Sequence, residues 1–275
     1  MVFYALMPGS ERTLYQFPVS HYCEKSRWNL DAKGLSYEIK NLLPGLHRRV
    51  TTRLTKGRGT VPVLVENGAA IGDSTEIALH LERAHPSSPA LVPASEPERK
   101  RVLELEDYFD YMAGAHVRRW MYAQLIDGGA DLGALVFSGY PAPQRWIGRM
   151  MSPVLASLLR RQYKLVPPKV EESRVKLLEG LERLEREIQG DPSRYLVGFS
   201  LSIADITAAA LYSPLLAPEG SPYAARPGEV VPPAIAELRA AVLARPAGQW
   251  LLRRYREDRQ RPARGFNAAS QAANG

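Results

Sequence analysis

The sequence predicts an α/β domain followed by an all-helical domain. Up to residue 85, short segments of β-branched or alternating residues take turns with segments of helical periodicity. Downstream of residue 97, only helical periodicity is found. A turn-rich stretch from Pro86 to Pro97, which begins Pro-Ser-Ser-Pro, separates the two halves. We therefore expect domains at residues 1–86 and 97–260, followed by a flexible basic tail at residues 261–275.

The first half has the expected element order βαβαββα. Strands are expected at residues 13–17, 37–42, 61–65 and 69–71, and helices at residues 22–33, 48–56 and 74–85. A helical crossover implies that the first two strands are parallel. The turn Glu66-Asn67-Gly68 implies an antiparallel hairpin between the last two strands. A mixed sheet covered by helices follows.

The second half predicts helices throughout. They are expected at residues 97–126, 144–163, 168–189, 203–216 and 234–256. Six prolines fall between residues 214 and 233. This density of proline excludes a helix and predicts a long surface loop.

Composition limits the function classes. The 275 residues include one cysteine, so no disulfide can form within the chain, and a cytoplasmic location is expected. No segment approaches 18 consecutive apolar residues, which argues against a membrane span. More than half of the net charge of +7 comes from six arginines after residue 252. We interpret these arginines as solvated, so neither nucleic acid nor a membrane is an expected partner.

The segment after the first strand contains a candidate catalytic residue, Ser20. A helix begins there, and a helix start presents unpaired amide groups and a positive dipole end that favour a thiolate or another anion. Simple capping of the helix explains the same serine. Cys23, three residues further on, is either a small buried side chain or a reactive thiol.

A proline heads the third expected strand, in the sequence Val61-Pro62-Val63. Proline cannot donate to a β-ladder, so it belongs at an edge. A cis Val61-Pro62 bond there would leave the amide and carbonyl of Val61 free for a peptide ligand. An ordinary proline at the start of a strand is the alternative.

The last helix of the first half begins at Asp73-Ser74-Thr75-Glu76. Asp73 and Glu76 have the spacing of a capping box. Asp73 also offers a carboxylate for an ammonium group, and Ser74 with the helix amides offers donors for a carboxylate. A ligand with an amino-acid head group would match both, and the two interpretations are compatible.

In this order and spacing, the features resemble the glutathione S-transferase superfamily over nearly the whole chain. Ser20, followed seven positions later by Arg27, is similar to the catalytic segment of its cysteine- and serine-type members. The strand around Val61-Pro62 resembles the cis-proline strand of the family.

Two further motifs carry the resemblance. Asp73-Ser74 looks like the acid-serine pair that holds the γ-glutamyl end of glutathione. In the second half, Ser202 and Asp205 are similar to the helix-capping motif of the family, which is structural.

The resemblance implies a thioredoxin-like first domain, an all-helical second domain and a homodimer. It implies an enzyme of detoxification that binds glutathione as co-substrate, without a metal, and conjugates it to a small apolar electrophile. Ser20 would stabilise the glutathione thiolate. The implied glutathione-binding residues are Val61, Pro62, Asp73, Ser74, His47 and Arg48.

The electrophile would rest between the domains. The helix expected there carries Tyr108, Met112 and His116, which share one face by their i, i+4 spacing. Residues of this kind at helical spacing also pack in cores, and that alternative stays open.

The chain departs from the family at several points. Ser20-His21-Tyr22-Cys23 has serine where glutaredoxins and omega-like members have cysteine, and residues 128–166 lengthen the second domain. Tyr15 is a rival hydroxyl donor, because other classes use tyrosine. Three rival functions remain. These are a non-catalytic glutathione-binding or assembly module, a thiol reductase that needs an exposed Cys23 with a depressed pKa, and nucleic-acid or lipid binding by the arginine tail.

Overall fold

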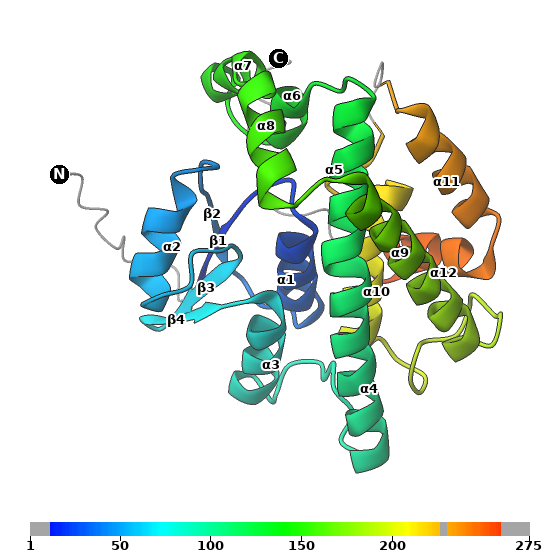
Figure 1. Ribbon diagram of the computed structural model, residues 1–275. Helices are drawn as coiled ribbons and strands as arrows, with labels where there is room; N and C mark the ends of the chain where they lie inside the picture. The colour runs from blue at the N-terminus through cyan, green and yellow to red at the C-terminus, as the bar shows by residue number, and fades with distance from the viewer. Residues whose placement is uncertain (1–11, 226–229, 260–275) are drawn as a thin grey trace, which may run out of the picture.

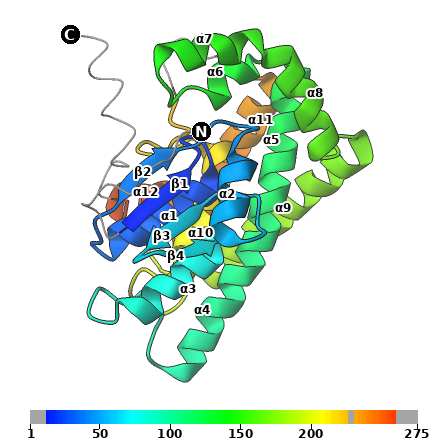
Figure 2. The ribbon, with the colours of Figure 1, turned by 90° about the vertical axis from the view of Figure 1, so that its left-hand side faces the viewer.

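The computed structural model describes residues 12–225 and 230–259. A sheet-containing N-terminal half lies beside a larger bundle of helices (Figures 1 and 2). The predicted fold class is confirmed: a thioredoxin-like βαβαββα unit is followed, in the described residues, by helices alone. None of the described helices is both long enough and apolar enough to cross a lipid bilayer.

The N-terminal half follows the predicted element order. Its elements are β1 (Arg12–Gln16), α1 (His21–Ala32), β2 (Glu38–Asn41), α2 (His47–Thr55), β3 (Val63–Glu66), β4 (Ala69–Gly72) and α3 (Ser74–Ala84). The sheet order is β2-β1-β3-β4. β1 and β2 are parallel and β3 and β4 form an antiparallel hairpin, as predicted. β1 and β3 are also antiparallel. Figure 1 shows α1 and α3 between the sheet and the helical half, with α2 on the opposite face.

A small apolar cluster fixes α1 and α3 against the sheet. It consists of Leu14, Leu30, Leu64, Ile77 and Leu81, all fully buried. Leu14 and Leu64 are register partners in β1 and β3. Burying one such side chain contributes about 1.5–3 kcal/mol. Through Leu30, this cluster fixes the C-terminal half of α1 against the sheet.

The helical half is built around one central helix, α10 (Ile203–Leu216). Each of its 14 residues is buried. Its start is the capping box predicted at Ser202 and Asp205, in which Asp205 Oδ2 accepts from the Ser202 amide at 2.9 Å. Helices α4 (Glu96–Phe109), α5 (His116–Asp127), α11 (Pro233–Leu243) and α12 (Pro246–Glu257) pack against it. The remaining helices are α6 (Leu132–Val136), α7 (Ala142–Met150), α8 (Ser152–Gln162) and α9 (Pro167–Glu187).

Three predicted helices need correction. Residues 97–126 are continuous but contain a π-helical turn at Asp110–Ala115. Residues 144–163 divide into α7 and α8, because Pro153 has no amide hydrogen to continue the helix. Residues 234–256 divide at Pro246, which holds Arg245 in an extended conformation (φ −96°, ψ 157°).

The interpretation of the C-terminal arginines as solvated is wrong for two of them. Arg254 is 1% exposed and Arg259 is 6% exposed. Arg254 pairs with Asp258 at 2.9 Å, and Arg259 pairs with Asp31 of α1 at 2.7 Å. The end of the described chain therefore returns to the N-terminal half. The expected tail at residues 261–275 lies outside the described residues.

Candidate functional site

Ser20 lies at the junction of β1 and α1 and is the N-cap residue of α1. Its backbone is extended (φ −150°, ψ 123°), and its Oγ accepts a hydrogen bond from the Cys23 amide at 3.4 Å. Because Ser20 accepts through its oxygen, its hydroxyl proton remains available to a second partner. The side chain is half-buried. The helix dipole makes this corner favourable for an anion.

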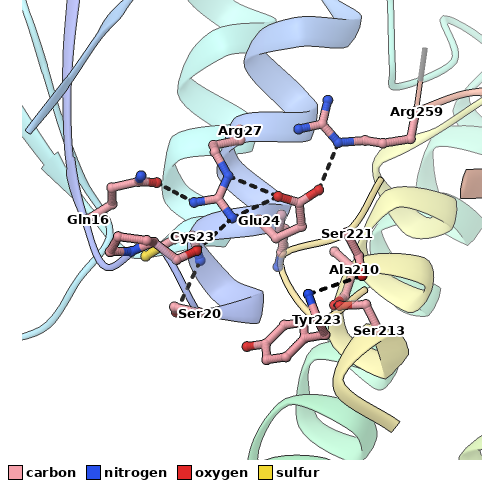
Figure 3. Close-up of polar contacts among 12 residues, drawn as sticks. Gln16, Ser20, Cys23, Glu24, Arg27, Ala210, Ser213, Ser221, Tyr223 and Arg259 are labelled. Carbon is pink, nitrogen blue, oxygen red and sulfur yellow. Dashed lines mark hydrogen bonds and ion pairs between the residues drawn. The ribbon is translucent and has the colours of Figure 1, made fainter. Parts of the chain in front are cut away.

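Behind Ser20, a buried ion network holds α1 and the preceding loop (Figure 3). Arg27 Nε donates to Glu24 at 2.9 Å, and its terminal nitrogens donate to the Gln16 side chain and to the Pro18 carbonyl. Arg259 donates to the other Glu24 oxygen at 2.8 Å. Arg27 is itself buried. Its contacts fix the loop that leads to Ser20.

Cys23 is fully buried. Burial raises the pKa of its thiol above the usual value, against the opposing effects of the Arg27 charge and the Ser20 hydroxyl. The reductase hypothesis requires an exposed thiol with a depressed pKa. Both observations go against it.

Tyr15, the rival donor, lies within β1. It is the register partner of Lys40 in β2, and Lys40 Nζ lies 5.6 Å from the centre of its ring. The Tyr15 ring therefore lies against the neighbouring strand. Ser20 is the residue that caps α1.

The head of β3 has the predicted geometry. The Val61-Pro62 bond is cis. The first ladder pair between β1 and β3 joins Tyr15 and Val63, so Val61 precedes the paired part of the strand. Val61 itself is half-buried, whereas Pro62 is buried.

The start of α2 lies beside both of these segments. The His47 ring packs edge-on against Phe17 of the loop before α1, with 4.8 Å between ring centres. Arg48 lies close to Gly59, where its Nε would be 3.3 Å from an added Cβ. Burial and the Arg48 charge lower the pKa of His47. Arg48 and its neighbour Arg49 are exposed.

Asp73 caps α3 with a left-handed backbone (φ 85°), which costs a non-glycine residue about 1–3 kcal/mol. Its carboxylate accepts from the Thr75 amide at 2.9 Å and from Arg58 at 2.6 Å. The predicted capping box of Asp73 and Glu76 is wrong, because the Asp73 side chain accepts from the Thr75 amide instead. Ser74, the next residue, is buried.

Lys25 is a residue that the sequence analysis missed. It is fully buried in α1 and donates to Thr75 at 2.8 Å, to Asp110 at 2.7 Å and to Glu106. These contacts join the start of α3 to α1 and α4. No local pattern marks this lysine, because its partners lie 50 to 85 positions away.

The three residues predicted to contact the electrophile share one face, but that face packs against α9. Arg183 of α9 lies 5.4 Å from the Tyr108 ring centre, and His116 Nδ1 lies 3.1 Å from Ser173. Met112 packs beside Gly180 of α9. Tyr108, Met112 and His116 therefore pack against α9, as the alternative interpretation expected.

A pocket with a cavity volume of about 80 Å³, partly open to solvent, lies next to Ser20. Both sequence neighbours of Ser20, namely Val19 and His21, line it. The other lining residues come from α5, α6, the end of α10, the proline-rich loop and α11, and most are apolar or aromatic. They are Arg118, Met121, Tyr122, Leu125, Leu135, Val136, Pro214, Tyr223, Ala224, Val231, Ile235 and Arg239. The sequence analysis missed this pocket, since no motif connects these segments.

The π-helical turn ties the helical half to the start of α1. His21 Nε2 donates to the Gly114 carbonyl at 3.0 Å. Burial, reinforced by the Arg118 charge, lowers the pKa of His21 to about 3, so the ring is neutral. A Cβ on Gly114 would lie 2.1 Å from the Tyr22 hydroxyl oxygen. Close approach of α1 therefore requires glycine at this position.

Residues 128–166 also contact the N-terminal half. Figures 1 and 2 show α6, α7 and α8 above the start of α1. The Tyr140 hydroxyl donates to the Leu42 carbonyl at 2.5 Å. A Cβ on Gly139 would lie 2.3 Å from Pro18, so this contact is close as well. This segment therefore packs on the loop that precedes Ser20 and contributes part of the pocket wall.

Comparison with known proteins supports this description. Residues 14–89 match the family model described as glutathione S-transferase, N-terminal domain. No curated protein matches the chain. Residues 14–89 therefore belong to this N-terminal domain family. The solved structures that share the fold of the chain include Tau, Omega and beta-etherase proteins, all less than 25% identical to it.

Several solved structures share the fold at low sequence identity. The beta-etherase LigF from Sphingobium sp. strain SYK-6 is 23% identical, with a TM-score of 0.56 over 89% of this chain and 100% of that one. The Tau class enzyme from mango, Mangifera indica, is 14% identical, with a TM-score of 0.57 over 96% of both chains. A glutathione S-transferase from Methylobacterium radiotolerans in complex with glutathione sulfonate is 20% identical, with a TM-score of 0.52 over 86% and 92%.

Proposed function

We propose that this protein is a glutathione transferase in which Ser20 stabilises the glutathione thiolate for attack on a small apolar electrophile. One observation carries the proposal. Ser20 caps α1, and both of its neighbours, Val19 and His21, line the pocket. A thiolate held at Ser20 would therefore lie beside the pocket, which would hold the electrophile. The similar protein that binds glutathione sulfonate supports glutathione as the co-substrate.

The energy required for this activation is modest. A free thiol with a pKa near ~8.5 is only a few per cent ionised at neutral pH. Lowering the pKa by about two units requires about 2.7 kcal/mol of preferential thiolate stabilisation. A hydrogen bond from a hydroxyl to a charged group contributes about 1.5–3 kcal/mol, and the helix start adds to it. Ser20 acts as a hydrogen-bond donor in this mechanism and forms no covalent bond.

The remaining groups would bind the peptide. The Val61 backbone would pair with the cysteinyl part, Asp73 and Ser74 with the γ-glutamyl part, and His47 or Arg48 with the glycyl carboxylate. Asp73 already pairs with Arg58, but both side chains are nearly half exposed. Such a pair contributes only about 0–1 kcal/mol, so the ammonium group of a ligand can replace Arg58 at little cost.

The proposal extends to the organisation of the protein. Residues 1–86 would form the glutathione-binding domain and residues 97–260 the helical domain. The protein would be a cytoplasmic homodimer.

Replacing Ser20 tests the proposal. Ser20→Ala should leave glutathione affinity within a few-fold, because other residues hold the peptide. Turnover of an aromatic halide should fall by about 10- to 100-fold, and the pH of half-maximal rate should rise toward that of free glutathione. Ser20→Thr keeps a hydroxyl and a cap, and should retain most of the activity.

Cys23→Ala is the matched control and should change turnover little. If Cys23→Ala abolishes turnover while Ser20→Ala leaves the rate and its pH profile unchanged, the serine mechanism is wrong. Glutathione binding without turnover across a panel of aromatic halides and unsaturated carbonyls would instead favour a binding module.

A further inference from the structure

Arg118 of α5 lines the pocket beside His21, and none of the described acidic residues pairs with it. Among the described residues, no carboxylate lies within ion-pair distance of its guanidinium, and its buried Nε has no hydrogen-bond partner. The guanidinium lies over two aromatic rings, 5.4 Å from the centre of Tyr22 and 4.6 Å from that of Tyr163. Such contacts use the faces of the group and leave its N–H donors, which lie in the plane, for an acceptor.

The pocket around Arg118 has a positive charge that its walls do not neutralise. Neither aspartate nor glutamate is among the described lining residues. Burial lowers the pKa of His21 and raises the pKa values of Tyr122 and Tyr223, so all three are neutral near pH 7. Arg239, on the opposite element α11, donates to the Leu215 carbonyl. A cation in a mostly apolar pocket favours a ligand that supplies the missing anion.

We propose that Arg118 selects electrophiles that carry a carboxylate on an aromatic or other apolar body. The carboxylate would accept from the guanidinium, while the body would pack against Met121, Leu125 and the tyrosine rings of the pocket. This inference rests on the proposed transferase function and adds the substrate class. Arg118 is then a residue of substrate specificity, separate from the activation of the thiol at Ser20.

A matched pair of substrates tests the inference. 4-Chloro-3-nitrobenzoate and 4-chloro-3-nitrobenzamide differ in the charge of one group. In both, the glutathione sulfur forms a bond to the ring carbon, chloride leaves with its bonding electrons, and the thiol proton goes to solvent. After correction for the uncatalysed rates, kcat/KM for the acid should exceed that for the amide by about 10-fold or more.

Two variants assign the preference to Arg118. Arg118→Gln should lower kcat/KM for the acid by about 10- to 100-fold and for the amide by less than about threefold. Arg161→Gln removes the same charge from an exposed position on α8 and should change neither. Non-reactive 4-methyl-3-nitrobenzoate, titrated calorimetrically, should bind wild type more tightly than its amide and lose that advantage in Arg118→Gln.

The possible outcomes distinguish failure of this inference from failure of the proposed transferase function. If wild type has equal corrected kcat/KM values for the acid and the amide, the inference is overturned and the transferase proposal is unaffected. This result needs no variant. A raised KM for glutathione in Arg118→Gln, with the acid-to-amide ratio unchanged, assigns Arg118 to glutathione and also overturns it. Failure of wild type to bind glutathione at all removes the proposed function itself.

Discussion

Replacing Arg259 with glutamine should destabilise the protein strongly, although this arginine follows the last described helix, α12 (Pro246–Glu257). Its guanidinium donates to Glu24 at 2.8 Å and to Asp31 at 2.7 Å, and all three side chains are nearly inaccessible to solvent. The substitution removes one positive charge from a cluster in which Arg27 and Arg259 balance two carboxylates. Glu24 retains Arg27, whereas Asp31 retains a 3.3 Å contact with the Tyr37 hydroxyl.

The expected loss follows from this imbalance. Removing one partner of a buried ion pair costs about 3–5 kcal/mol, because the remaining charge is left without compensation. Burial already raises the pKa of Asp31 against the effect of Arg259, and loss of the Arg259 charge raises that pKa further, which favours protonation of Asp31. Protonation limits the cost, and we expect about 3 kcal/mol. At about 2–4 °C per kcal/mol, Tm should fall by about 6–12 °C.

Urea unfolding and thermal melting measure this effect, with Arg256→Gln as the control. Arg256 lies three positions before Arg259, in the last turn of α12, but is 72% exposed, and its loss should cost less than about 0.5 kcal/mol. Adding Asp31→Asn to Arg259→Gln removes the uncompensated carboxylate, so the double variant should lose less than the sum of the single losses. Equal stability of Arg259→Gln and Arg256→Gln, or strict additivity in the double variant, refutes the reasoning.

Two further predictions follow from His21 and from the family. The pKa of His21 is about 3 in the folded protein and near 6.5 when unfolded, so the unfolded state binds more protons below pH 6.5 and stability falls as pH falls. Between pH 7.5 and 5.0 this residue should cost about 2 kcal/mol, and His21→Gln should remove that part of the slope in urea unfolding; an unchanged slope contradicts the pKa assignment. Sedimentation at micromolar concentration should give a species of twice 30.6 kDa, and a single species of the chain mass would exclude the homodimer.

Sequence predicted the features that depend on near neighbours. The strand and helix order of the N-terminal half follows from periodicities within about ten residues. Ser20 and Ser202 were recognised as caps because an N-cap acts on amides two or three positions away. The capping box of Ser202 and Asp205 was predicted for the same reason and is confirmed. The predicted capping box of Asp73 and Glu76 is wrong, because the Asp73 side chain accepts from a nearer amide, that of Thr75.

Sequence could not predict which neighbour covers each face. The spacing of Tyr108, Met112 and His116 correctly places them together, but helical periodicity does not say what lies opposite. In the folded protein that neighbour is α9. Arg259 illustrates the same limit, because its partner Asp31 lies 228 positions away. From sequence alone, a run of basic residues is predicted to be solvated, because the distant carboxylates that could pair with it are not apparent.

The two sides of the candidate site therefore differ in how far sequence constrains them. Ser20, Val61 and Asp73 lie within the segment that matches the family model, and short motifs mark each of them. The pocket wall comes almost entirely from beyond residue 89, from segments that no shared motif connects. Activation of a thiol needs only a donor at a helix start, which a short motif can encode. Under the proposed function, substrate choice depends on charges brought together by packing, and the guanidinium of Arg118, which pairs with none of the described carboxylates, is such a charge. The substrate class must therefore be inferred from the pocket itself, since the motif that names the family leaves it open.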